Sequence, residues 1–172
     1  EKDGEISVIE INSETDFVAK NKDFISFCKE ISQICFEQKG EIEKINLSIM
    51  KNNISVKDNL IDLIAKIGEK ITLRRAKYFD KKSGLNFSYV HSAIEKNIGK
   101  IVSIVKLNIS ENAKDIGGKL AMHIAASNPL ALDENNLNKE TVDKELEIIK
   151  AELLNSGKKP EMIDKISQGK LN

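Results

Sequence analysis

The chain has 172 residues, which is enough for one domain or for two small subdomains with a buried core. Hydrophobic residues make up 40% and charged residues 31%, as is typical of a soluble globular protein. Lys and Arg together number 27, as do Asp and Glu, so the formal net charge is zero. This balance argues against nucleic acid as the main partner, because proteins that bind phosphate backbones normally carry a basic surplus.

No targeting or membrane segment is visible in the sequence. No apolar run approaches the roughly 18 residues of a membrane-spanning helix, and the charged residues 1–4 do not resemble a signal peptide. The first residue is not Met, so we expect an excised fragment. Cys28 and Cys35 fall about 10 Å apart on a predicted helix, which is too far for a disulfide. We therefore expect two buried thiols and a reducing, cytoplasmic setting.

The first elements are a strand and a long helix. Apolar and polar residues nearly alternate over residues 5–12, which predicts a strand. Ser13 or Thr15 is a candidate cap for one helix predicted over 17–38 and ended by Gly40. The apolar face of this helix consists of Phe24, Cys28, Ile31 and Cys35.

A second helix and a second strand follow. Ser55 with Asp58 three residues later resembles a capping box and predicts a helix over 55–67, which Gly68 ends. Its inner face is predicted to consist of Leu60, Leu63, Ile64 and Ile67. A strand is predicted over 70–79, whereas residues 41–54 show no clear period.

A charged, turn-rich segment at 80–84 separates these elements from two more predicted strands, at 85–92 and 99–108. A helix is then predicted over 112–126. The residues predicted to face inward on this helix are Ile116, Leu120 and Ile124.

The last part of the sequence predicts a helical hairpin. The helix over 139–155 carries a narrow apolar seam that suits one partner helix. The seam consists of Val142, Leu146, Ile149 and Leu153. A turn at 156–160 places Gly157 after one helix and Pro160 at the start of the next. The second arm is expected to be truncated at Asn172.

The elements together predict an α+β fold. It consists of two subdomains of antiparallel strands packed with helices, plus a projecting antiparallel helical, coiled-coil hairpin. We expect an N-terminal core subdomain at 1–80, a C-terminal core subdomain at 81–132 and the hairpin at 133–172. The elements do not alternate strictly between strand and helix, which disfavours a doubly wound parallel sheet.

The sequence carries no convincing enzyme motif. Gly117-Gly118-Lys119 resembles the end of a phosphate-binding loop, but the earlier glycine is missing and Leu120 replaces the Ser or Thr that holds magnesium. The two histidines, His91 and His123, lack ligands at metal-binding spacing, and we expect His123 to pack in the core or at a subdomain interface. We therefore predict no catalytic residue, no metal and no cofactor.

One segment, residues 15–21, combines an aromatic side chain with a carboxylate at a strand-to-helix junction. In one interpretation Thr15 or Asp16 caps the helix and Phe17 packs underneath as an apolar anchor. In the other, Phe17 projects into a partner while Asp16 contacts polar groups there. Periodicity alone favours the packed anchor.

Five segments in one order resemble the elongation factor Ts family. They are 11–21 (INSETDFVAKN), 66–71 (KIGEKI) followed by Arg74 and Arg75, 88–91 (SYVH), 121–129 (AMHIAASNP) and 156–160 (SGKKP). The resemblance covers nearly the whole chain. Two positions depart from the family pattern, because Lys70 stands where Asn is usual and Ser92 where Gly commonly follows the histidine. We also expect the fragment to lack the family's N-terminal ubiquitin-associated-like module and the segment after the coiled coil.

The resemblance implies a guanine nucleotide exchange factor that binds elongation factor Tu and promotes GDP release. Such a factor is not an enzyme with covalent chemistry and binds no nucleotide directly. Asp16 and Phe17 match residues that intrude into the GTPase near its magnesium and phosphates. Thr15 and Val18 flank them in the predicted contact. The resemblance adds Ile67, Gly68 and His91 to the partner-binding residues.

Two other functional classes remain open. The first is a non-catalytic interaction module that binds elongation factor Tu or a related partner without efficient exchange. An RNA-binding role would use Arg74, Arg75 and Lys77, but sparse aromatics supply few stacking platforms. The resemblance also leaves open a homodimer, since some relatives pair. We expect no membrane partner.

Overall fold

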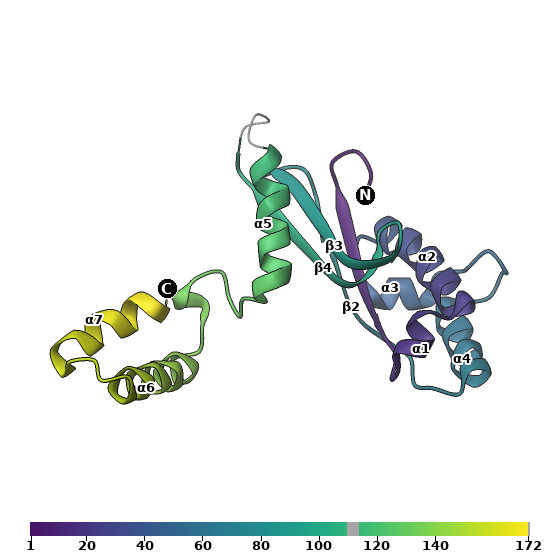
Figure 1. Ribbon diagram of the computed structural model, residues 1–172. Helices are drawn as coiled ribbons and strands as arrows, with labels where there is room; N and C mark the ends of the chain where they lie inside the picture. Colours follow the sequence, from purple (N-terminus) through teal and green to yellow (C-terminus); the bar gives the residue numbers. More distant parts are fainter. Residues whose placement is uncertain (110–113, 172) are drawn as a thin grey trace. The chain divides into compact units, whose positions relative to one another are not determined.

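A computed structural model of the chain describes residues 1–109 and 114–171. It divides into two compact units, Glu1–Ser127 and Asn128–Asn172, which are described separately below (Figure 1). Helices and two small antiparallel sheets make the fold α+β, as predicted. The finer division of the first unit near residue 80 stays a prediction.

The first unit begins with an antiparallel strand pair. β1 (Ile6–Asn12) pairs with β2 (Thr72–Phe79), so that Ile6 lies opposite Phe79. Four helices connect the two strands: α1 (Asp16–Ala19), α2 (Lys22–Glu37), α3 (Ile42–Leu47) and α4 (Val56–Ile67). Both strands match the sequence prediction to within two residues at each end.

The core of this region lies where the helices meet the strands. Four side chains from α2, α3 and the start of α4 have no exposed surface: Ile31, Cys35, Ile45 and Val56. Leu60, Ile64 and Ile67 pack against this core, as their helical spacing predicts. Burial of these apolar side chains is the main stabilising term for the first sheet and its helices.

The prediction of a single helix over 17–38 is wrong in one respect, because α1 ends at Ala19 and the backbone is extended at Asn21 before α2 begins. The side chain of Asn21 accepts hydrogen bonds from the backbone N–H groups of Asp23 (2.8 Å) and Phe24 (3.3 Å), which caps α2. Asn is among the strongest capping residues. Thr15 occupies the cap position of α1, but its side chain makes no capping hydrogen bond.

The predicted cap of α4 is confirmed. The Ser55 hydroxyl oxygen accepts from the Asp58 backbone N–H at 3.1 Å and donates to the Asp58 carboxylate at 2.7 Å. Gly68 ends the helix with φ at 80°, a left-handed conformation that suits glycine. The short helix α3 lies in the region where the sequence shows no clear period.

The second sheet consists of β3 (Leu85–Glu95) and β4 (Ile98–Leu107), which pair antiparallel. Helix α5 (Lys114–Ser127) packs against both strands (Figure 1). The first residues of the helix predicted over 112–126 lie outside the described residues. Both strands are close to the predicted ranges.

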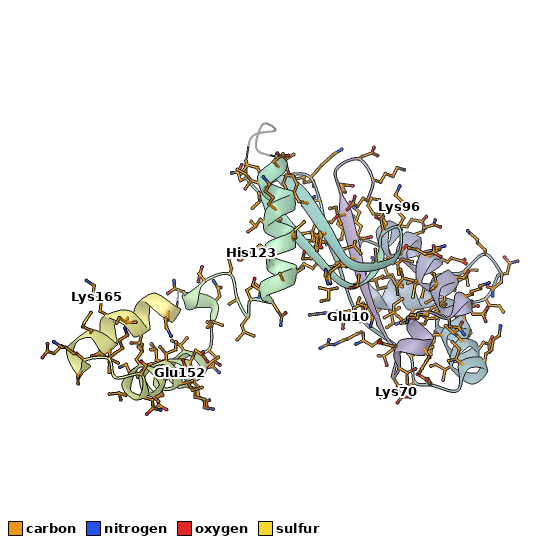
Figure 2. All side chains as sticks on the ribbon, in the orientation of Figure 1. Glu10, Lys70, Lys96, His123, Glu152 and Lys165 are labelled. Atoms are coloured by element: carbon orange, nitrogen blue, oxygen red, sulfur yellow. The ribbon has the colours of Figure 1, made fainter. Side chains whose placement is uncertain are left out.

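The predicted inward face of α5 needs correction. Ile116 is 59% exposed, and His123 is exposed rather than packed at an interface (Figure 2). Leu120 and Ile124 are half-buried, in line with the prediction, but the fully buried positions are Gly117 and Ala121. A Cβ atom at Gly117 would lie 2.3 Å from the ring of Phe87, so the missing side chain lets the helix approach β3 closely. Small residues therefore determine which face of α5 packs on the strands, although the apolar pattern predicts a face that includes Ile116.

The second unit contains α6 (Lys139–Asn155) and α7 (Pro160–Leu171), with a short 3-10 turn at Glu134–Asn136 before them. The two helices pack through Ile149, Leu153 and Ile163, and Lys150 forms an ion pair with Asp164 at 2.7 Å. The bounds of α6 match the predicted helix over 139–155. That the pair forms a coiled coil stays a prediction. No helix among the described residues is both long and apolar enough to cross a membrane.

Candidate functional site

Two loops of the first unit are tied together beside the start of α1. The Thr15 hydroxyl donates to the Glu69 carboxylate at 2.7 Å, and the Thr15 backbone N–H donates to the same carboxylate at 3.1 Å. In return, the backbone N–H of Lys70 donates to the Glu14 carboxylate at 3.1 Å. These reciprocal bonds fix residues 14–15 against residues 69–70. Two sequence segments that the resemblance singled out separately therefore form one structure.

Phe17 and Val18 are neighbours in the single turn of α1 but face opposite environments. Val18 is 3% exposed and belongs to the core, whereas Phe17 is 85% exposed. Val18 anchors the turn, and the Phe17 ring projects from it into solvent. The interpretation of Phe17 as a packed anchor is therefore wrong.

Asp16 forms an ion pair that the sequence did not reveal. The Lys100 ammonium on β4 donates to the Asp16 carboxylate at 2.8 Å. This hydrogen bond and the positive charge of Lys100 lower the pKa of Asp16. Lys100 lies 84 residues from Asp16 in the sequence, so no local pattern could have shown the contact.

Ile67 and Gly68 lie at the end of α4. Ile67 is partly buried against the core, and Gly68 turns the chain so that Glu69 reaches Thr15. A Cβ atom at Gly68 would meet no other atom within 4 Å. The positive φ favours glycine at this position, and the open side of Gly68 leaves room for close approach by another molecule.

His91 stands apart from the other predicted residues. It is exposed on β3, where its Nδ1 lies 3.3 Å from the Tyr89 hydroxyl. Ile101 of β4 lies opposite His91 of β3 in the strand pair. Lys100 therefore precedes, by one residue, the residue that pairs with His91. Among the described contacts, none joins His91 directly to Asp16 or Phe17. Lys100, which binds Asp16, directly precedes Ile101 on β4.

The described residues show neither a cluster of metal ligands nor an activated cysteine. Within residues 1–109 and 114–171, no group of three or more His, Cys, Asp or Glu side chains gathers as metal ligands would. The two cysteines are free, and burial raises the pKa of Cys28 to about 12 and also raises the pKa of Cys35. Both thiols therefore stay protonated at neutral pH and are poor nucleophiles. An exposed aromatic on a fixed turn is a typical protein-binding anchor.

Comparison with known proteins identifies the family. A family model described as elongation factor TS matches residues 14–172. Elongation factor Ts of Rhodopseudomonas palustris (strain BisB5) is 40% identical over 167 residues, which is 95% of this chain and 54% of the relative. The Nitrobacter hamburgensis protein of the same name is 38% identical with the same coverage. That of Gluconobacter oxydans is 33% identical over 168 residues, 96% of this chain and 56% of the relative.

The chain spans about half the length of the curated relatives it matches. The matching part extends from the strand-to-helix junction at Phe17 through the helices of the second unit. Because the family model covers far more than half of the chain, the assignment does not depend on one motif. The chain belongs to the elongation factor Ts family.

Proposed function

We propose that this chain is a guanine nucleotide exchange factor that binds elongation factor Tu and promotes GDP release during translation elongation. Membership of the family supports a role in translation elongation. The observation that carries the finer proposal is the 85% exposure of Phe17 on a turn held by Val18 and by the Thr15–Glu69 hydrogen bonds. A large apolar side chain gains free energy when a partner covers it.

The surface around Phe17 suits insertion of one aromatic side chain, called the wedge below, better than it suits a broad apolar interface. A few aromatic anchors usually carry most of the binding free energy, and they work best when the free protein already holds them in place. Three hydrogen bonds and one ion pair constrain the residues around Phe17: Thr15 to Glu69 twice, Lys70 to Glu14, and Lys100 to Asp16. The backbone of this turn therefore has less conformational entropy to lose on binding than a loop without such hydrogen bonds.

Exchange follows from linkage between two binding equilibria. A factor that prefers the nucleotide-free GTPase must weaken nucleotide binding by the same coupling free energy. In our proposal Phe17 enters the GTPase beside Asp16 and displaces elements that hold magnesium. Loss of the ion leaves the charges it had neutralised to repel each other, and GDP leaves. This step forms and breaks no covalent bond.

The other predicted residues take different parts in this proposal. Val18 has almost no exposed surface, so it supports Phe17 from the core instead of touching the partner. Ile67 and Gly68 border the same contact, with Gly68 allowing close approach of the partner backbone. His91 binds a second part of the GTPase from β3. We further propose a cytoplasmic location, and a homodimer stays a prediction.

The test is release of a fluorescent GDP analogue from elongation factor Tu at physiological magnesium, with and without the chain. We expect strong acceleration by the wild-type chain. Absence of both binding and acceleration would reject the proposed function.

A second candidate function rests on the length of the chain. Because it spans about half of its relatives, it can act as a module that binds elongation factor Tu without efficient exchange. Tight binding in a pull-down or calorimetric titration, combined with no faster GDP release, would favour this alternative. Both measurements belong in the same experiment.

A further inference from the structure

The strand pair at residues 85–107, called the β3–β4 ribbon below, is fixed at its base. The Asn86 side-chain amide donates to the carbonyl oxygens of Gly4, Phe79 and Asp80 at 2.9, 3.2 and 2.8 Å. Lys106 adds an ion pair with Asp80 at 2.6 Å. These bonds join the start and end of the ribbon to the end of β2. The base of the ribbon therefore has a definite attachment to the first sheet.

Two further ion pairs attach the tip of the ribbon to two different helices. Near the turn, Glu95 pairs with Lys29 of α2. On the following strand, Lys100 pairs with Asp16 of α1 at 2.8 Å. One pair thus uses a carboxylate of the ribbon and the other a cation of the ribbon. The helices that receive them are the two helices that follow β1.

Between base and tip the ribbon is not packed tightly on the first sheet. A cleft of about 990 Å³ lies between β1, α2 and the ribbon. Its apolar lining includes Val8, Ile25, Cys28, Val90, Ile98 and Ile104. Helix α5 packs extensively on both ribbon strands, whereas no element among residues 6–79 does so. The two ion pairs therefore have few packing contacts to assist them in holding the tip.

We propose that Lys100 is a positioning residue for the exchange reaction: together with Lys29 it latches the ribbon tip to α1 and α2, and so sets the spacing between Phe17 and His91. The inference rests on the proposed function, in which these two side chains engage one partner. Two contact points on one rigid body bind more tightly than two that move independently, because the second contact then costs less entropy.

The two ion pairs that form the latch are weak, because all four side chains are substantially exposed to solvent. Lys100 and Asp16 side chains are 47% and 74% exposed, and those of Lys29 and Glu95 are 51% and 40% exposed. Exposed ion pairs contribute little each and are screened by salt. We therefore expect loss of one pair to raise the open population of the ribbon about twofold, and loss of both about fourfold.

The chain contains its own probe of this opening. Cys28 lines the cleft on α2, and Cys35 lies on the same helix with no exposed surface. The rate of alkylation by iodoacetamide, measured separately for each cysteine by peptide mass spectrometry, distinguishes ribbon opening from unfolding of α2. Opening exposes Cys28 alone, whereas unfolding of the helix exposes both thiols.

The variants are Lys100→Gln, Lys29→Gln and the double variant, with Lys96→Gln as matched control. Lys96 lies at the ribbon tip (Figure 2), and no ion pair among the described contacts includes it. We expect faster alkylation of Cys28 by the factors above, unchanged Cys35 and an unchanged control. Added salt should raise the wild-type rate toward that of the double variant. Unchanged Cys28 alkylation in the double variant, or an equal rise at Cys35, would overturn the latch.

Exchange kinetics then test the link to function. If positioning matters, Lys29→Gln should raise the KM for elongation factor Tu·GDP about twofold and leave kcat unchanged, although Lys29 lies on α2 and not in the α1 turn that carries Phe17. An unchanged KM in a variant whose Cys28 alkylation is faster would refute the positioning role. If the wild-type chain itself gives no exchange, the proposed function fails, and the alkylation result still decides whether the latch exists.

Discussion

Replacement of Phe17 by Ala separates an effect on partner binding from an effect on folding. Full burial of a Phe side chain is worth about 1.5–3 kcal/mol. Phe17 is 85% exposed, so the remaining buried part, roughly 15% of the surface, contributes only about 0.2–0.5 kcal/mol to folding. We therefore expect nearly unchanged urea unfolding for Phe17→Ala.

The effect of the same change on exchange should be large. An aromatic anchor at the centre of an interface typically contributes 2 kcal/mol or more, which corresponds to a loss of about 30-fold in kcat/KM. The assay is release of fluorescent GDP from elongation factor Tu over a range of chain concentrations. Phe24→Ala provides the contrast, because Phe24 is 7% exposed and its truncation should cost about 3–5 kcal/mol of stability.

The three outcomes of this experiment are easy to tell apart. A Phe17→Ala variant that folds normally but exchanges poorly supports the wedge. A variant that loses several kcal/mol of stability would show that Phe17 belongs to the core in solution. A variant that is stable and fully active would show that the exposed ring has no part in exchange, and the proposed mechanism would have to be abandoned.

Three further predictions concern stability, each measured by urea unfolding. Gly117→Ala should destabilise by about 1–3 kcal/mol, because its Cβ would collide with a facing ring, whereas Gly118→Ala, with open space, should stabilise by up to about 1 kcal/mol. Equal effects would contradict the close approach of α5. Ser92→Gly should stabilise by about 0.5–1 kcal/mol, since φ is 49° at Ser92 and left-handed geometry favours glycine; a loss of stability would argue against this angle. Hydrogen bonding to Arg74 and a neighbouring arginine lowers the pKa of Glu10 from 4.5 to about 2. The resulting stabilisation is present above pH 4.5 and disappears as pH falls toward 2. Between pH 6 and 2 the wild type should therefore lose about 1 kcal/mol more than Glu10→Gln, and parallel pH profiles would refute the assignment.

The sequence was sufficient where structure follows from local pattern. The period of apolar residues predicted α4 and α6 closely, and the Ser55 cap is in place. It was insufficient where one residue overrides a pattern. Asn21 interrupts an otherwise continuous helical period, because its side chain satisfies backbone N–H groups that a continuous helix would bond internally.

The candidate site shows the same division. Local sequence indicated that Thr15, Asp16 and Phe17 form one segment. It could not show that Glu69 binds Thr15 or that Lys100 binds Asp16, because these pairs are 54 and 84 residues apart. Charged residues are common throughout the chain, so only the fold selects which of them meet.

The break between α1 and α2 at Asn21 determines the direction in which the Phe17 ring points. Phe17 precedes Phe24 by seven residues, or nearly two full turns, so an uninterrupted helix would place both rings on one side. Phe24 points into the core. The wedge is therefore exposed because the helix restarts, and a substitution that fused α1 with α2 would rotate Phe17 toward the interior without altering the residue itself.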